Sequence, residues 1–238
     1  MWPNRRLLDL LEIDLPIIQA PMAGAGGSAL AVAVSEAGGL GSLPCAMLSE
    51  DQMRAEAGII RQQTANPFNM NFFCHTPVAV TAAQQADWTA RLAPFYAEAG
   101  LDSRAVAPAP LRRPFDAEMC ALVEDIKPEV VSFHFGLPEP ALLDRVRATG
   151  ARILSSATTV AEARWLATHG VDAIIAQGYE AGGHRGMFLT QDITAQPGVM
   201  ALVPQIVDAV DVPVIAAGGI ADGRGIAAAF ALGAAGVQ

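Results

Sequence analysis

Apolar residues recur along the whole chain in short runs separated by longer amphipathic stretches. Eight of these runs are continuously apolar rather than alternating, which is typical of strands buried on both faces of a parallel sheet. The runs cover residues 16–22, 40–46, 68–74, 130–136, 151–157, 173–179, 213–219 and 234–238. We therefore predict eight parallel strands.

The stretches between these predicted strands carry the apolar spacing of amphipathic helices. They lie at residues 28–37, 49–64, 138–149, 159–169, 199–210 and 222–232. Strand and helix alternate, as in right-handed βαβ units. One interval, about 75–129, is much longer than the others, and its helical stretches at 81–99 and 116–126 predict a helical insertion or lid.

Eight parallel strands with intervening helices predict an α/β fold of the (β/α)8 TIM-barrel type, as one domain over residues 1–238. A doubly wound open sheet is the alternative, and it explains the number of strands less well. The barrel makes a positional prediction, because functional groups gather just after each strand, at the C-terminal rim.

The eighth predicted strand coincides with the end of the printed sequence at Gln238. We expect a barrel that is incomplete at strand 8 and has no eighth helix, in a chain that is C-terminally truncated or part of a longer one. We also expect an unsealed ring of strands, with unpaired ladder groups on an open edge. Such an edge would predict association with another copy, as a homo-oligomer.

Composition and charge narrow the class of protein. The 238 residues are 52% hydrophobic and 16% charged and include 22 glycines, which describes a well-buried α/β protein with many loops defined by their backbone. The formal net charge of −9 offers no basic stripe for a phosphate backbone, so we expect no nucleic-acid partner. Neither the N-terminal segment nor the glycine-punctuated run after Ile215 predicts a membrane span.

The cysteines and histidines give no sign of a disulfide framework or a metal site. Cys45, Cys74 and Cys120 are an odd number without CxxC spacing, which favours reduced thiols in a cytoplasmic protein. The histidines are scattered without a His-x-His or HExxH pattern, so we expect no metal. His75 and His169, at a strand end and a helix end, are expected to be structural or solvent-facing.

The candidate chemistry centres on residues 177–186, Gln-Gly-Tyr-Glu-Ala-Gly-Gly-His-Arg-Gly, at the end of the sixth predicted strand. Four glycines let the backbone approach a flat or anionic ligand, and His184 among them can exchange protons near neutral pH. We favour His184 as a functional residue over the alternative, a turn residue hydrogen-bonded to the backbone.

Polar groups at the other strand ends indicate the kind of ligand. The side-chain amides of Gln19, Asn71 and Gln177 can both donate and accept, which suits the edge of a flavin or nucleobase. Gly218 and Gly219 offer a close turn with free amides in a loop where barrels often hold a phosphate. Together they indicate a phosphorylated planar cofactor, most simply FMN. Taken singly, the amides are equally well explained as satisfied buried groups and the glycines as ordinary turn formers.

A second histidine and two methionines receive supporting roles. His134 lies between Phe133 and Phe135 in the fourth predicted strand, so we expect its side chain to point opposite to theirs, as a core or supporting imidazole. Met22 and Met187 either contact a ring or fill irregular space, and filling is the favoured interpretation.

Six segments of the chain carry a family resemblance. They are Gln-Ala-Pro-Met at 19–22, Ala-Gly-Gly-Leu-Gly at 37–41, Phe-Asn-Met-Asn-Phe at 68–72, Ser-Phe-His-Phe-Gly at 132–136, the decapeptide at 177–186 and Ala-Ala-Gly-Gly-Ile at 216–220. In sequence and in order these segments resemble nitronate monooxygenases, formerly called 2-nitropropane dioxygenases. The resemblance covers nearly the whole chain, and the Glu-Ala-Gly-Gly-His-Arg-Gly segment is specific for the bacterial class I type.

The resemblance implies a non-covalently bound FMN in a (β/α)8 barrel. It implies oxidation of alkyl nitronates or nitroalkanes by O2 to carbonyl compounds and nitrite, with propionate 3-nitronate as a characteristic substrate. His184 matches the family's catalytic base, which removes the α-proton of a neutral nitroalkane, and His134 would assist in the polar shell. The residues that match or adjoin the family's FMN contacts are Ala20, Pro21, Met22, Ala23, Asn71, Gln177, Gly182, Gly183, Gly218 and Gly219.

Two other interpretations stay open at this point. One is another FMN-dependent barrel oxidoreductase, of the enoyl-carrier-protein reductase or NAD(P)H:quinone reductase type, which would be reduced by a pyridine nucleotide. The other is a catalytically inert, truncated barrel. Family members continue past strand 8 with a glycine, a small hydroxyl residue and further helices, none of which is present in this sequence.

Overall fold

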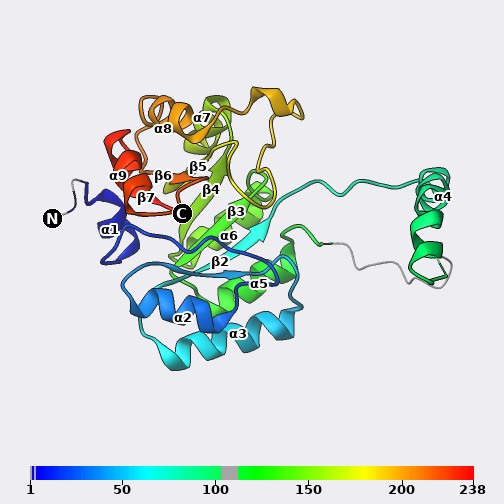
Figure 1. Cartoon of the computed structure of the whole chain (residues 1–238). Helices are drawn as coiled ribbons and strands as arrows, with labels where there is room; N and C mark the ends of the chain where they lie inside the picture. Colours follow the sequence, from blue (N-terminus) through cyan, green and yellow to red (C-terminus); the bar gives the residue numbers. More distant parts are fainter. Residues whose placement is uncertain (1, 3, 103–111) are drawn as a thin grey trace. The chain divides into compact units, whose positions relative to one another are not determined.

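Parallel strands, arranged in sequence order, form the centre of the larger of the two compact units of the chain (Figure 1). The computed structural model describes residues 2, 4–102 and 112–238. Its sheet has the order β1-β2-β3-β4-β5-β6-β7. The strands are β1 (Gly41–Pro44), β2 (Phe68–Phe73), β3 (Val130–His134), β4 (Arg152–Ala157), β5 (Ala173–Gln177), β6 (Val214–Ala217) and β7 (Gly236–Val237). Each lies within a predicted strand.

A short segment before β1 closes the sheet into a ring. Ile17 forms a parallel bridge with Val237, and Ile18 forms one with Leu40. The N–H of Ile18 donates to the carbonyl of Val237 at 2.8 Å, and the N–H of Val237 donates to the carbonyl of Pro16 at 2.9 Å. The expectation of an unsealed edge with unpaired ladder groups was therefore wrong, because the first predicted strand reaches a neighbour on each side.

The fold is the predicted (β/α)8 TIM barrel, incomplete at strand 8. Strand 8, β7, has only two residues, and no helix follows it in the part of the chain that the structure describes. Since the ring is closed, the argument for a homo-oligomer that rested on an open edge does not hold.

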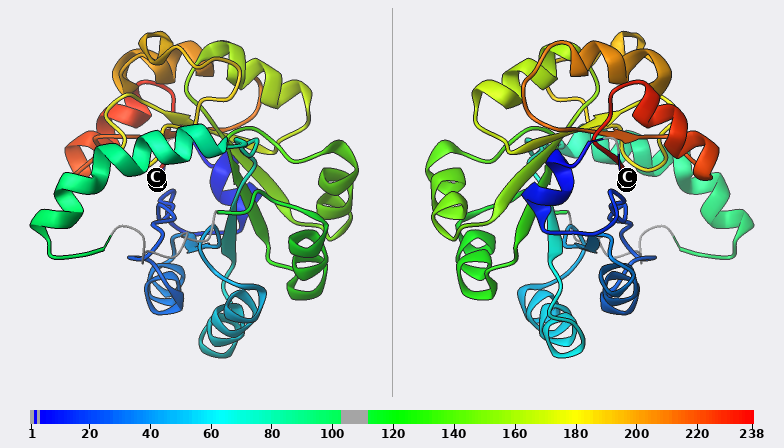
Figure 2. Two further views of the ribbon diagram at one scale, coloured as in Figure 1. Left: turned by 90° about the vertical axis from the view of Figure 1, so that its right-hand side faces the viewer. Right: turned by 90° about the vertical axis from the view of Figure 1, so that its left-hand side faces the viewer.

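Helices cover the outside of the ring (Figure 2). Several begin at side chains that accept hydrogen bonds from the first N–H groups, such as Ser49, Asp116 and Thr159. The covering helices are α2 (Ser28–Glu36), α3 (Glu50–Gln63), α5 (Ala117–Ile126), α6 (Pro140–Ala148), α7 (Val160–Thr168), α8 (Val199–Val207) and α9 (Gly223–Ala231). Each was predicted to within a few residues; the short 3-10 helix η1 (Ile193–Ala195) was not.

Helix α1 (Arg6–Leu11) closes the N-terminal end of the barrel and was not predicted. Its buried side chains Leu7, Leu8 and Leu11 share one apolar cluster with inward-facing strand residues, among them Leu154 and Ile175. A helix of six residues is too short to show a clear period in the sequence, so packing against the barrel determines it.

Residues along each strand alternate between the helix-facing cluster and the barrel interior. In β3, Val131 and Phe133 belong to the outer cluster, whereas Val130 belongs to the inner one. The inner positions further along are polar, at Ser132 and His134. The barrel interior is therefore apolar near α1 and polar toward the C-terminal ends of the strands.

The long interval 75–129 divides differently from the expectation. The described residues between Thr76 and Arg113 form a compact unit of their own, with helix α4 (Ala82–Glu98). Helix α5 belongs to the barrel unit, because its side chains Met119, Cys120, Leu122 and Val123 are buried in the barrel's outer cluster. The separate segment is therefore shorter than the interval that the sequence suggested.

The cysteines at positions 45, 74 and 120 are free, and burial raises the pKa of the Cys45 and Cys74 thiols. Among the described helices, none is both long and apolar enough to cross a bilayer. The described residues also contain no group of three or more His, Cys, Asp or Glu side chains arranged to hold a metal ion.

Candidate active site at the barrel rim

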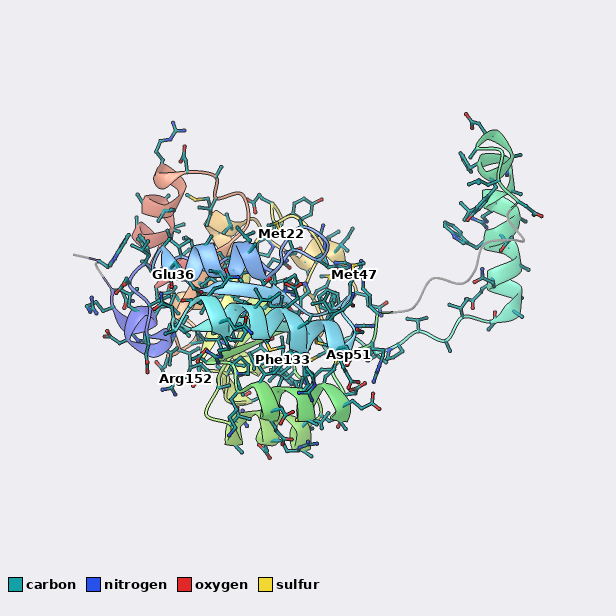
Figure 3. All side chains as sticks on the ribbon, turned by 90° about the horizontal axis from the view of Figure 1, so that it is seen from below. Met22, Glu36, Met47, Asp51, Phe133 and Arg152 are labelled. Atoms are coloured by element: carbon teal, nitrogen blue, oxygen red, sulfur yellow. The ribbon has the colours of Figure 1, made fainter. Side chains whose placement is uncertain are left out.

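The predicted site residues gather at one end of the barrel. Figure 3 shows Met22 and Met47, which follow the first two strands, displaced toward one end from Glu36, which precedes β1, and from Arg152, which begins β4. The C-terminal ends of parallel strands all meet at this end. The polar residues at or near those ends are Asn71 in β2, His134 in β3, Ser156 in β4 and Gln177 in β5.

His134 holds the loop between β5 and η1, residues 178–192, which carries His184 and is called the His184 loop below. Its Nε2 lies 3.0 Å from the main-chain oxygen of His184, and its Nδ1 lies 3.0 Å from Oγ of Ser156. Because a carbonyl oxygen only accepts, Nε2 donates and Nδ1 accepts from the Ser156 hydroxyl, which assigns the tautomer. Burial lowers the pKa of His134 to about 4, so this imidazole is neutral at pH 7.

Gln177 holds the same loop from the end of β5. Its Nε2 donates to the main-chain oxygen of His184 at 3.0 Å, and its Oε1 accepts from the N–H of Gly186 at 2.7 Å. A side chain at Gly186 would bring a Cβ within 2.6 Å of Cε1 of His134, so only glycine fits there. The predicted cofactor-binding amide of Gln177 is thus used first to shape the His184 loop.

The His184 side chain is exposed at the rim beside two phenylalanines. Its ring centroid lies 5.3 Å from that of Phe73 and 6.0 Å from that of Phe135, both edge-on. With its carbonyl accepting from His134 and Gln177, the backbone of His184 is fixed while its imidazole is presented outward. This geometry suits a group that exchanges a proton with a small molecule.

Phe135 turns back to the site instead of facing away from it. Phe133 lies in the helix-facing cluster and so points opposite to His134, as predicted. Phe135 has a φ of 69°, in the left-handed region that bulky residues rarely adopt, and its ring lies 4.5 Å from the His134 ring. The expectation that Phe135 points opposite to His134 was wrong, because the alternation of a strand ends where the backbone becomes left-handed.

Asn71 lies in a polar layer inside the barrel. Its Nδ2 donates to Oγ of Ser132 at 2.9 Å, and Nδ2 of Asn69 donates to the same oxygen at 2.9 Å. Gln19 exchanges two hydrogen bonds with the backbone of Ser42, at 3.0 and 3.1 Å, and so joins the first strand to β1. The interpretation of Gln19 as a satisfied buried amide is confirmed.

The predicted phosphate-binding glycines lie against the His184 loop. Gly218 and Gly219 have φ values of 118° and 68°, and a Cβ on Gly218 would come within 2.9 Å of the main-chain nitrogen of Ala181. By contrast, a Cβ on Gly182 or Gly183 would meet no atom within 4 Å. Open space therefore adjoins the backbone of Gly182 and Gly183.

The N-terminus of α9, which follows Gly219, already has an acceptor. Asp222 Oδ1 accepts from the N–H groups of Arg224 and Gly225 at 2.9 and 3.3 Å, and these bonds lower the pKa of the Asp222 carboxyl after the larger effect of the Arg224 side chain. The amides expected for a phosphate are therefore those of the glycine turn and not those of the helix.

Residues 20–23 follow the first strand and line the rim as a turn. Ala20 and Pro21 are half-buried, whereas Met22 and Ala23 are exposed. The main-chain oxygen of Met22 accepts from the N–H groups of Ala25 and Gly26 at 3.1 and 2.7 Å. Because 47% of Met22 is exposed, it does not fill space in the core, so the favoured interpretation of this residue was wrong.

Several residues of the site were not predicted from the sequence. In the folded barrel, Phe73, Phe135 and Ser156 approach the two site histidines, and His75 approaches the rings of Phe73 and Phe135. Glu162 contacts the His184 loop from α7, and Gln196 accepts a hydrogen bond from the Arg185 side chain of that loop. Alternation within β3 and β4 could have indicated Ser156 as a partner of His134; nothing local indicates the others.

Fold and site together define a class of protein. It is a parallel α/β barrel whose C-terminal rim presents one exposed imidazole beside a glycine-lined opening, which is where barrel enzymes hold their reactive groups. The family model described as nitronate monooxygenase matches residues 4–238. The chain belongs to the nitronate monooxygenase family.

Individual relatives agree with this assignment. A nitronate monooxygenase of Paraburkholderia phytofirmans is 46% identical over 240 residues, covering 99% of this chain and 64% of the relative. A nitroalkane oxidase of Streptomyces ansochromogenes superposes with a TM-score of 0.87 at 40% identity, covering 98% of this chain and 66% of that one. FabK of Thermotoga maritima gives a TM-score of 0.74 at 33% identity, with 100% and 61% covered. The chain thus spans about two thirds of the length of these relatives.

Proposed function

We propose that this chain provides the barrel of an FMN-dependent enzyme that oxidises alkyl nitronates and nitroalkanes with O2 to carbonyl compounds and nitrite. His184 acts as the catalytic base. One observation carries the proposal: the imidazole of His184 stands exposed at the rim of a barrel of this family, while its own carbonyl is fixed by His134 and Gln177. The free cysteines further support a cytoplasmic location.

The glycine-lined part of the rim fits a phosphorylated planar cofactor. Open space adjoins Gly182 and Gly183, and in the described part of the chain no hydrogen bond is recorded from the N–H groups of these glycines or of Gly218 and Gly219. Successive N–H groups in left-handed backbone form a concave site that suits an anion. In the proposal the four glycines hold FMN through their backbone, and the exposed Met22 turn contacts its ring.

His184 supplies the proton chemistry. When bound, FMN would accept electrons from the nitronate, which is chemistry that no side chain supplies. A neutral nitroalkane must first lose the proton on the carbon next to the nitro group, and a ring nitrogen of His184 takes that proton. The imidazolium that forms then stabilises the negative charge of the nitronate. An already anionic nitronate needs no such base.

His134 is proposed as a positioning residue and not as a second base. Both of its ring nitrogens have partners, and burial keeps it neutral, so no free nitrogen faces a substrate. Its contribution is to fix the carbonyl of His184 and thereby the direction of the reactive imidazole.

The role of His184 is tested by comparing two substrates in one variant. In His184→Asn, O2 consumption with nitroethane should fall by about a hundredfold or more, because general base catalysis is lost. With ethylnitronate it should change by less than about threefold, because that substrate carries no proton to remove. The matched control is His169→Asn, in which the C-cap histidine of α7, at the end of the helix away from the rim, is replaced; it should match the wild type on both substrates.

Equal losses on both substrates would contradict the assignment of His184 as a base. The similarity to FabK gives the other candidate a concrete basis, an FMN barrel reduced by a pyridine nucleotide. Anaerobic reduction of the FMN-loaded protein by NADH, but not by ethylnitronate, would favour that candidate. A protein that takes up no added FMN would favour the inert barrel.

A further inference from the structure

Glu162 is a buried carboxyl group outside the residues assigned so far. It lies in the first turn of α7 and is 0% exposed. Among the described residues no ion pair is recorded for it within 4.0 Å, so its oxygens are satisfied by hydrogen bonds alone. Buried carboxyl groups without a cation are rare, because removing a charge from water is costly. A specific set of donors must therefore stabilise this one.

Four donors surround the carboxyl group, two on each oxygen. Oε2 accepts from the N–H and the hydroxyl of Thr158, both at 2.7 Å. Oε1 accepts from the N–H of Phe188 at 2.7 Å and from the N–H of Leu189 at 3.2 Å. One oxygen is thus bound to the end of β4 and the other to the loop that carries His184.

This arrangement differs from ordinary helix capping. In a capping box the third helical residue bonds back to the N-cap residue, which in α7 is Thr159. Glu162 instead reaches Thr158, one residue earlier, and leaves a whole oxygen for Phe188 and Leu189. The carboxyl group therefore joins two elements that are far apart in the sequence, and not only the start of its own helix.

The loop is fixed at Phe188 by packing as well. A Cβ on Gly136 would come within 3.2 Å of the Phe188 ring, and Trp165 contacts the same ring edge-on at 5.2 Å between centroids. Between this anchor and β5, hydrogen bonds to His134 and Gln177 hold the loop at the carbonyl of His184 and at the N–H of Gly186. The His184 imidazole thus stands on a segment fixed on both sides.

We infer that Glu162 is a positioning residue for the reactive imidazole: its carboxyl group fixes residues 188 and 189, and thereby keeps His184 and Gly186 against His134 and Gln177. Charge-assisted hydrogen bonds are about twice as strong as neutral ones, so this carboxyl group gives the loop a firm second anchor. The inference rests on the proposed role of His184. Whether Glu162 anchors the loop can be tested separately from that role.

The test uses Glu162→Gln, which keeps the shape of the side chain. Whichever way the amide is turned, its NH2 group faces two N–H or O–H donors in place of an acceptor. The readout is the amide-exchange rate of Gly186 in the protein without added cofactor, measured by NMR. Gly186 donates to Gln177 and not to Glu162, so its exchange reports release of the loop beyond the mutated contact.

Exchange at Gly186 should become about tenfold faster or more in Glu162→Gln, while amides of the barrel core, such as Ile153 and Ile174, keep their rates. Faster exchange confined to Phe188 and Leu189 would overturn the inference. The matched control is Glu56→Gln, since Glu56 also accepts a backbone hydrogen bond, from Ser28 at 2.8 Å, but far from this loop. It should leave Gly186 unchanged.

A second variant covers the case in which Glu162→Gln does not fold. Glu162→Asp keeps the carboxyl group but shortens it by one methylene, so it reaches Thr158 or the loop but not both. It should also speed exchange at Gly186, by a smaller factor than the amide variant, and an unchanged rate would overturn the inference.

Turnover of two substrates provides a further readout, because a merely structural role of Glu162 would not affect one substrate more than the other. With FMN bound, Glu162→Gln should lose about tenfold in kcat on nitroethane, with ethylnitronate changed by less than about threefold. Equal loss on both substrates would overturn the positioning role. If the wild type oxidises neither substrate, the proposed function fails, and the exchange rates still decide whether Glu162 anchors the loop.

Discussion

The two site histidines differ in chemistry because their surroundings differ. His184 is exposed at the rim, whereas His134 is enclosed by Phe73, Phe135 and its two hydrogen-bond partners. Burial stabilises an imidazole in its neutral form, which is the form that can accept from Ser156 while donating to a carbonyl. Burial therefore makes His134 a fixed connector and leaves proton exchange to His184.

The neutral state of His134 predicts a pH dependence of stability. Its pKa is 6.5 as an ordinary histidine and about 4 in the folded protein, so between these values the unfolded chain binds more protons. The stabilisation is complete above about pH 6.5 and is lost as the pH falls toward 4. From pH 7 to pH 4, the free energy of unfolding should fall by about 3 kcal/mol more in the wild type than in His134→Gln.

Urea unfolding of both proteins at several pH values measures this difference. Because the same carboxyl groups titrate in both proteins, their effect cancels when the variant is compared with the wild type. Parallel pH profiles would show that His134 is protonated without penalty and would contradict the tautomer assigned to it.

At the residue scale, the sequence predicted which residues lie at the rim better than it predicted which residues they contact. His184 and His134 both proved to be at the rim, because a strand end is recognisable from the apolar run before it. The turn of Phe135 toward the site was not predictable, since nothing in Ser-Phe-His-Phe-Gly marks the left-handed residue. The role of Glu162 was not predictable for another reason: its partners Phe188 and Leu189 lie 26 and 27 residues further along the sequence.

The loops after β5 and β6 act as one element. Gly218 packs against Ala181, and Gly219 packs against Glu180, whose Oε2 caps α8 by accepting from Val199 at 2.8 Å. The predicted phosphate turn and the predicted base loop are therefore in direct contact, and a change in one is expected to displace the other.

This contact gives a paired prediction for two glycines. Gly218→Ala should lower the free energy of unfolding by about 1–3 kcal/mol, because its φ of 118° is strained for alanine and the new methyl meets Ala181. Gly182→Ala should change stability by less than about 0.5 kcal/mol, because its methyl enters open space.

The same two variants test where the cofactor lies. If FMN occupies the space beside Gly182, the alanine should weaken FMN binding by about tenfold without affecting folding. Fluorescence titration of FMN and urea unfolding measure the two effects. Unchanged FMN binding in Gly182→Ala would place the cofactor elsewhere on the rim.

Element types and order were predictable from the sequence, but lengths and ends were not. Continuous apolar runs and amphipathic spacing locate β1 to β7 and the helices that cover them. Helix α1 escaped detection because its leucines are determined by the barrel that they close. The assignment of α5 to the insertion reflected the length of the interval alone, which carries no information on packing.

For the molecule as a whole, closure of the ring depends on one close approach. A Cβ on Gly236 would lie 2.3 Å from Cδ2 of Leu7 and 2.9 Å from the carbonyl oxygen of Pro16. Gly236 is therefore the point at which the first strand, the last strand and the N-terminal helix meet. The sequence offered only a short apolar run here, so its closing role could not be predicted.

Gly236→Ala should lower the free energy of unfolding by about 1–3 kcal/mol, since the added methyl would meet the backbone of Pro16 and the side chain of Leu7. Gly58→Ala is the matched control, because Gly58 lies within α3 and its added methyl would meet nothing within 4 Å. That change should stabilise the protein by about 0.5–1 kcal/mol through helix propensity. Thermal or urea unfolding decides, and equal stabilities of the two variants would contradict closure through Gly236.

The pairing of Ile17 with Val237 also has a consequence for biosynthesis. On the ribosome, the segment around Ile17 emerges early, whereas Val237 follows only after every other strand has been translated. The growing barrel therefore has two unpaired edge strands until β7 has been translated. Contacts between residues so distant in sequence also form slowly. Until that closure, the unpaired strand edges offer backbone groups with which another chain can pair.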